Sequence, residues 1–164
     1  MSADKILGNM HTWKGQEEVV EVNFFWFEME KKRISKTACN GETIGVCIEE
    51  TLKEGDVIAK EDDTIYVVSL QPELLIQVEV SSMEEMGRLG FELGNRHLSL
   101  QIDHNIVRVP FDSPTFSYLQ KLGFHVEKVE AKFQDYIVCK AHGNSSGHSH
   151  EHAHGEHQIG RAHV

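Results

Sequence analysis

Hydrophobic and polar positions follow one pattern before residue 71 and a different one after it. Short runs of β-branched and aromatic residues fill positions 17 to 70, separated by turn residues such as Asn40-Gly41, without a helical period. Pro72 then interrupts the pattern, because proline has no amide hydrogen to donate to a strand ladder. The pattern therefore predicts a β-rich domain over residues 1–72.

Strand and helix patterns alternate over residues 73–142. The predicted elements are strand 74–80, helix 82–93, strands 98–102 and 106–109 joined over Asp103-His104-Asn105, a helix capped by Ser113 with Pro114 at its first position, and closing strands 124–129 and 136–139. This β-α-β-β-α-β order is that of a ferredoxin-like sandwich. The predicted fold class is therefore α+β, with a small all-β domain followed by a ferredoxin-like domain.

The first predicted helix has recognisable ends. Its apolar face repeats at intervals of three and four residues, at Met83, Met86, Leu89, Gly90 and Leu93. Ser81 is its predicted N-cap, and Glu84 would complete a capping box. Gly94 and Asn95 are the predicted left-handed residues at its C-terminal end.

His97 follows that helix directly and precedes the strand pattern of Leu98, Leu100 and Ile102. A side chain at the joint of two rigid elements is held in place as a ligand or catalytic group must be, although a lone histidine is also common as a core or capping residue. One imidazole cannot hold a divalent ion, which takes about four to six ligands. The remaining ligands must come from elsewhere, such as a second copy related by a two-fold axis, His142 or the C-terminal tail.

The tail from residue 143 to 164 is rich in glycine, serine and histidine, and we expect it to be disordered and to bind metal. Its candidate ligands are His148, His150, His152, His154 and His157, with His163 near the end. Neutral imidazole suits nickel, zinc and copper alike, so the tail does not select among them. His150 to His154 also matches the protease pattern H-E-x-x-H, which requires a helix that this tract does not supply.

Composition excludes several function classes. The 164-residue chain has a formal net charge of −10, which disfavours binding to nucleic acid and favours binding to cations. It contains neither a run of about 20 apolar residues nor an N-terminal signal pattern, so we expect no membrane association and a cytoplasmic location. Cys39, Cys47 and Cys139 form no CxxC pair, and we expect all three to be buried and inert.

No enzymatic constellation is apparent. The sequence contains no nucleophile–base pair, glycine-rich phosphate loop or paired carboxylate site, and a hydrolase interpretation would rest on the tail motif alone. His11, His104 and His125 are predicted to be solvated rather than to bind metal. The sequence therefore predicts a metal-binding protein that is not an enzyme.

Four features in this order resemble the UreE family, the urease accessory proteins that act as nickel metallochaperones. They are the Gly94-Asn95-Arg96-His97 run after a helix, the strand that follows it, Ser113-Pro114 opening a second helix, and the histidine-rich C-terminus. The resemblance covers most of the chain. It implies that the protein donates Ni(II) during urease metallocentre assembly.

The resemblance also implies roles for particular residues. His97 would bind nickel at the interface of a homodimer, and His142 matches a histidine that contributes in some relatives. Arg96 would be structural, as the partner of a carboxylate or carbonyl group. Some relatives carry a histidine pair before the second helix, and the segment 109–113 has none.

The N-terminal domain resembles the family's peptide-binding domain. It would dock assembly partners, including the urease accessory GTPase and the urease apoprotein complex. The alternative interpretation is a storage or buffering protein for zinc or nickel with no urease client.

Overall fold

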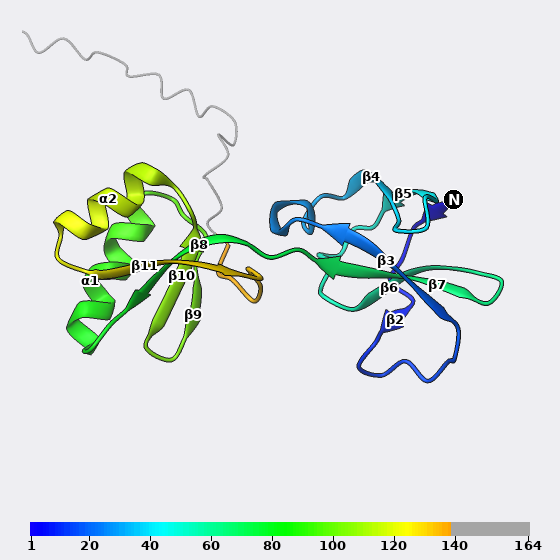
Figure 1. Cartoon of the computed structure of the whole chain (residues 1–164), viewed down its shortest axis with the longest axis horizontal. Coiled ribbons are helices and arrows are strands. Elements are labelled where there is room, and N and C mark those ends of the chain that lie inside the picture. Colours follow the sequence, from blue (N-terminus) through cyan, green and yellow to red (C-terminus); the bar gives the residue numbers. More distant parts are fainter. Residues whose placement is uncertain (139–164) are drawn as a thin grey trace, which may run out of the picture.

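The computed structural model describes residues 1–138, which form two domains, each with its own hydrophobic core (Figure 1). The histidine-rich tail, His142 and Cys139 lie outside the described residues. The strands of the N-terminal domain are β1 (Ser2–Ala3), β2 (Gly8–Asn9), β3 (Glu18–Phe24), β4 (Arg33–Thr37), β5 (Thr43–Cys47), β6 (Asp56–Glu61) and β7 (Thr64–Leu70), with a short 3₁₀ helix, η1 (Trp26–Glu28), after β3.

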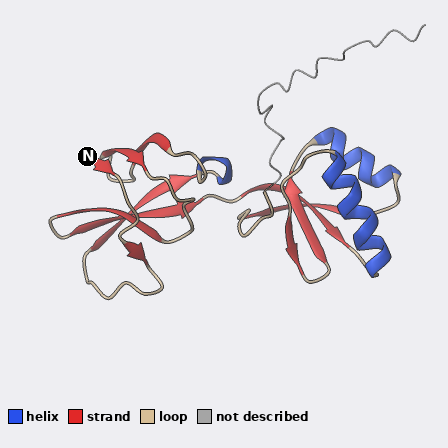
Figure 2. Cartoon of the chain, turned by 180° about the vertical axis from the view of Figure 1, so that it is seen from behind, coloured by secondary structure: helices blue, strands red, loops and turns tan. Residues whose placement is uncertain are grey.

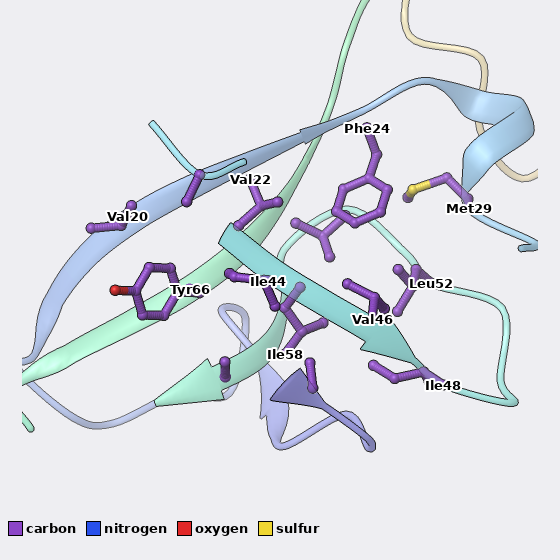
Figure 3. Packing of buried hydrophobic residues seen from close by; sticks show 14 of the residues in the cluster. Val20, Val22, Phe24, Met29, Ile44, Val46, Ile48, Leu52, Ile58 and Tyr66 are labelled. Atoms are coloured by element: carbon purple, nitrogen blue, oxygen red, sulfur yellow. The ribbon is translucent and has the colours of Figure 1, made fainter. Parts of the chain in front are cut away.

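These strands form two sheets, ordered β1-β5-β4 and β2-β6-β7-β3. Alternate side chains of β3, Val20, Val22 and Phe24, point into a core that Ile44 and Val46 of β5 also enter (Figure 3). Asn40-Gly41 forms the predicted turn between β4 and β5, with Gly41 at a φ of 90°. The predicted β-rich character of this part of the chain is confirmed.

The C-terminal domain has four strands and two helices among the described residues. They are β8 (Glu73–Glu79), α1 (Met83–Asn95), β9 (Gln101–Asp103), β10 (Ile106–Pro110), α2 (Ser113–Lys121) and β11 (His125–Ala131). The strands form an antiparallel sheet in the order β11-β8-β10-β9. Leu89 and Leu93 of α1 and Leu119 of α2 pack on the sheet with Ile76 and Val78, so both helices cover the same face (Figure 2).

Both helix starts differ from the prediction by one residue. The N-cap of α1 is Ser82, whose hydroxyl accepts the amide hydrogen of Glu85 at 3.1 Å, while the Glu85 carboxylate accepts from Ser81. The predicted Ser81–Glu84 capping box is therefore wrong. In α2 the N-cap is Asp112 rather than Ser113, and its carboxylate accepts from the Thr115 amide.

The chain after β11 returns to the N-terminal domain, and residues 136–138, the described part of the strand predicted at 136–139, do not form that strand. Phe133 is fully buried and stacks on Tyr136, with ring centroids 4.7 Å apart. Both rings make T-shaped contacts with Trp26 in η1. The Lys132 ammonium lies 2.7 Å from the Glu54 carboxylate. Only Ile137 makes a strand-like contact, an isolated antiparallel bridge to Leu100. This segment, residues 132–138, joins the two domains a second time.

Cys39 and Cys47 are exposed, contrary to the prediction, because Cys47 lies on the face of β5 opposite to Ile44 and Val46, and Cys39 lies just beyond β4. Within residues 1–138, no helix is sufficiently long and apolar to cross a membrane.

Candidate metal-binding site

His97 occupies the turn that ends α1. The helix continues through Asn95, and Arg96 is its C-cap. The His97 amide then donates to the Gly94 carbonyl at 3.0 Å, and the Leu98 amide donates to the Leu93 carbonyl at 3.2 Å. These two hydrogen bonds define a Schellman motif, in which the residue after the C-cap is left-handed.

The left-handed residue is His97 itself, with a φ of 55°, and not Gly94 or Asn95 as predicted. Glycine is the usual residue at this position, because a side chain there costs about 1–2 kcal/mol. His97 is nonetheless exposed. The imidazole is thus presented at the surface from a backbone conformation that is strained and held by two hydrogen bonds.

The strand after His97 begins later than predicted. β9 starts at Gln101, while Leu98 and Leu100 pack against the core of the domain before it. Leu100 exchanges two backbone hydrogen bonds with Ile137, at 3.2 and 2.7 Å. The segment between His97 and β9 is therefore anchored to the connection that leads toward the C-terminal tail.

Arg96 fills the structural role expected of it. Its Nε donates to the Thr115 hydroxyl at 3.0 Å, and its Nη2 lies 4.0 Å from the Asp112 carboxylate. The guanidinium also lies over the Tyr118 ring, 5.2 Å from the ring centroid. All three partners belong to the first part of α2 or to its cap, so Arg96 joins the end of α1 to the start of α2.

Two pKa values reflect this network. Hydrogen bonds from the Thr115 hydroxyl and amide hold the pKa of Asp112 below its usual value, and the nearby Arg96 charge contributes less. The hydrogen bond from Tyr118 to Glu92, at 2.9 Å, raises the pKa of Tyr118. Asp112 is therefore ionised at neutral pH and balances the charge of Arg96.

The other candidate histidines of the described region do not join His97. His104 is in the β9–β10 turn with its side chain 93% exposed and contacts Asp103, and His125 pairs with Glu127 at 3.3 Å. His11 is exposed near the N-terminus. Within residues 1–138 no cluster of three or more His, Cys, Asp or Glu side chains could hold a metal ion. His142, His148, His150, His152, His154 and His157 lie outside the described residues.

One face of α1 is unusually open. Met83 is 90% exposed and Phe91 is 67% exposed, although the sequence pattern places Met83 on the apolar face of the helix. A Cβ atom added at Gly87, Gly90 or Gly94 would have no neighbour within 4 Å. At 100° per residue these five positions fall on one stripe, offset from the buried Leu89 and Leu93. This stripe, residues 83, 87, 90, 91 and 94, leads along the helix toward His97.

Sequence reasoning did not find the partners of Arg96. Ser113 and Asp112 are both residues that cap helices, and an aspartate directly before Ser113-Pro114 is the signal for the cap that the structure has. Thr115 is only 1% exposed, and a buried threonine on a short amphipathic helix carries no local signal for an arginine 19 residues earlier.

The all-β domain, the two-helix α+β domain and the histidine at the end of α1 define a two-domain α+β protein that presents an imidazole on its surface. Residues 3–71 match the family model of the UreE urease accessory protein N-terminal domain, and residues 73–163 match that of its C-terminal domain. The chain belongs to the UreE urease accessory protein family, which assists urease rather than being urease.

Three relatives described as urease accessory protein UreE illustrate the similarity. The protein from Bifidobacterium longum subsp. infantis is 42% identical over 88% of this chain and 66% of its own length. The Acetivibrio thermocellus protein is 36% identical over 81% of this chain and 90% of its own length. The Flavobacterium johnsoniae protein is 32% identical over 91% of this chain and 94% of its own length. The chain thus spans just under two thirds of the first relative and nearly all of the other two. It follows that the family role is in urease maturation.

Proposed function

We propose that this protein is a nickel metallochaperone, which binds Ni(II) and donates it during urease metallocentre assembly. The observation that carries the proposal is the strained, exposed His97, because conformational strain of this kind is characteristic of ligand clamps. Membership of a urease accessory family supports urease as the protein that receives the metal. Nickel is the cargo, and zinc and copper would compete for the same imidazoles.

We further propose that the working form is a homodimer in which two copies of His97 share one ion. Residues 1–138 contain no group of three or more His, Cys, Asp or Glu side chains that could hold a metal ion, and a two-fold axis would bring a second His97 to the first. The open stripe on α1 supports this arrangement, since exposed Met83 and Phe91 beside three glycines allow another helix to approach closely. We also interpret the C-terminal domain as ferredoxin-like, as the strand order β11-β8-β10-β9 supports.

Connectivity supports His142 as a further ligand. Ile137 is bonded to Leu100, three residues after His97. His142 follows Val138, the last described residue, by four positions in the sequence. The tail histidines follow it, and we propose that they collect nickel for this site. The N-terminal domain would dock the urease accessory GTPase and the urease apoprotein complex.

The proposal is tested by adding nickel, and separately zinc, to the full chain and measuring the mass of the intact species at each step. The expected first product is a dimer carrying one nickel ion, with further ions binding afterwards. Monomers that fill with several ions without associating would contradict the shared site. That result would instead favour the storage or buffering function.

A further inference from the structure

We propose that Arg96 is the positioning residue of the nickel site, and that it fixes the His97 turn by holding it against the first turn of α2. This inference rests on the proposed function, because it concerns the same site. Arg96 is not itself a ligand, since a guanidinium remains protonated and has no lone pair to offer a metal. Its effect must therefore act through His97.

The side chain of Arg96 makes three different contacts that depend on a planar guanidinium. Nε donates to Thr115 at 3.0 Å, Nη2 faces the carboxylate of Asp112 at 4.0 Å, and the guanidinium carbon lies over the ring of Tyr118, 5.2 Å from the ring centroid. A lysine ammonium can reproduce the charge but not the fixed donor directions of the guanidinium that make these contacts together. Position 96 therefore requires the geometry of an arginine side chain as well as its charge.

The partners of Arg96 are themselves fixed. Thr115 is 1% exposed, and its hydroxyl donates to the Asp112 carboxylate at 2.6 Å. Tyr118 donates to Glu92 at 2.9 Å, and the Glu92 carbonyl accepts the backbone amide hydrogen of Arg96 at 3.3 Å. The contacts thus form a closed circuit from α1 to α2 and back. A side chain held in such a circuit constrains the backbone on either side of it.

The residue after Arg96 needs this constraint. His97 has a φ of 55°, and a left-handed conformation at a non-glycine residue persists only where its surroundings hold it. The helix end that leads into it contains Gly94, and glycine weakens a helix relative to alanine. The hydrogen bonds from His97 and Leu98 depend on this same helix end. Anchoring Arg96 to α2 keeps the imidazole in one direction before metal arrives.

Asp112 contributes a second effect. An unpaired arginine next to the ligand would repel a divalent cation, whereas the ionised Asp112 carboxylate compensates the guanidinium charge. These contacts therefore fix the position of His97 and also compensate the positive charge of the Arg96 guanidinium. Both effects favour tight binding without adding a ligand.

The test is calorimetric nickel binding to the full chain, with the Ni(II) absorption spectrum recorded for each variant. Arg96→Ala should weaken the tightest phase by roughly 10- to 100-fold, the range found when groups that orient a metal-binding histidine are removed. Its stoichiometry and the weaker phases should stay as in the wild type. Arg96→Lys should not restore the affinity, and Thr115→Val should reproduce part of the loss. The absorption of the tight complex should change in Arg96→Ala, which a loss of global stability alone would not cause.

Arg88→Ala is the matched control, because Arg88 is on the same helix and its guanidinium lies over the ring of Phe124, 5.5 Å from the ring centroid, nine residues before His97. It should bind nickel as the wild type does. Wild-type affinity in both Arg96→Ala and Thr115→Val would overturn the inference, as would an equal loss in Arg88→Ala or full rescue by lysine. If Arg96→Ala does not fold, Thr115→Val decides alone. His97→Ala distinguishes failure of the proposed function from failure of the role of Arg96. If the tight phase persists in His97→Ala, the proposed function is also overturned. If the tight phase is lost in His97→Ala but kept in the Arg96 and Thr115 variants, only the role of Arg96 is overturned.

Discussion

At the residue scale, His97 combines an exposed imidazole with a backbone conformation that glycine would adopt without strain. His104 has a similar φ of 54°, so what distinguishes His97 is its place at the joint between α1 and the chain that leads into β9. The cost of keeping it there is about 1–2 kcal/mol, and a ligand role accounts for that cost.

His97→Gly should therefore raise the free energy of unfolding of the metal-free protein by about 0.5–1 kcal/mol, since glycine relieves the left-handed strain. It should at the same time abolish the tightest nickel site. Urea unfolding and nickel calorimetry on the same samples measure the two effects.

The control for that experiment is His104→Gly. His104 has a φ of 54° in the β9–β10 turn, so its replacement should stabilise the protein similarly but leave nickel binding unchanged. A His97→Gly variant that is less stable than wild type would mean that the side chain contributes to folding, contrary to the role described.

At the element scale, the sequence predicted α1 well because its apolar residues repeat with helical period. The helix was expected at 82–93 and is found at Met83–Asn95. The sequence does not identify its N-cap uniquely, since Ser81 and Ser82 can both cap a helix. The structure distinguishes them by the bonds of Glu85, whose amide donates to the Ser82 hydroxyl and whose carboxylate accepts from Ser81. Cys47 was misassigned for a related reason, because alternation within β5 does not by itself say which face is buried.

The same helix supports a prediction about association. Phe91 is 67% exposed on the open stripe, so Phe91→Ser should leave the folded monomer intact. It should weaken nickel-dependent self-association by about tenfold or more, as removal of an aromatic anchor from an interface does. Sedimentation or light scattering with and without nickel would measure this.

Phe27→Ser is the matched control for Phe91→Ser, because Phe27 is 50% exposed but lies in η1 of the N-terminal domain. Its association should match that of the wild type. Equal association of both variants would show that the stripe on α1 is not the surface where the copies meet.

At the scale of the whole molecule, residues 132–138 connect the two domains through Phe133, Tyr136 and Trp26. This contact joins residues 110 positions apart, from the Tyr136 hydroxyl to the Trp26 carbonyl, and local patterns carry no information on it. The strand predicted at 136–139 was a reasonable interpretation of Tyr136-Ile137-Val138. Packing of the aromatic rings overrode that local preference.

Tyr136 gives this junction a dependence on pH. Burial, with a smaller effect of Glu30, raises the pKa of Tyr136 from 10.0 to about 12. The folded state therefore holds the phenol proton more tightly than the unfolded state, and this stabilisation is complete below pH 10 and is lost as the pH rises toward 12.

Tyr136→Phe keeps the stacked ring and should flatten the fall in unfolding free energy between pH 10 and about 12. Glu30→Gln should have a smaller effect in the same direction, because it removes the lesser cause of the raised pKa. Urea unfolding at several alkaline pH values provides the measurement. An unchanged slope in Tyr136→Phe would mean that other groups govern the alkaline transition.

The central claim is that two copies of His97 share one tightly bound nickel ion. Calorimetric nickel titration of the wild type, His97→Ala and a chain ending before Gly143 tests it most directly. The account predicts a high-affinity phase at about one ion per two chains in the wild type, its loss in His97→Ala with the weaker phases retained, and fewer weak sites in the shortened chain. A high-affinity phase of that stoichiometry in His97→Ala would contradict the claim and transfer the chemistry to His142 or the tail.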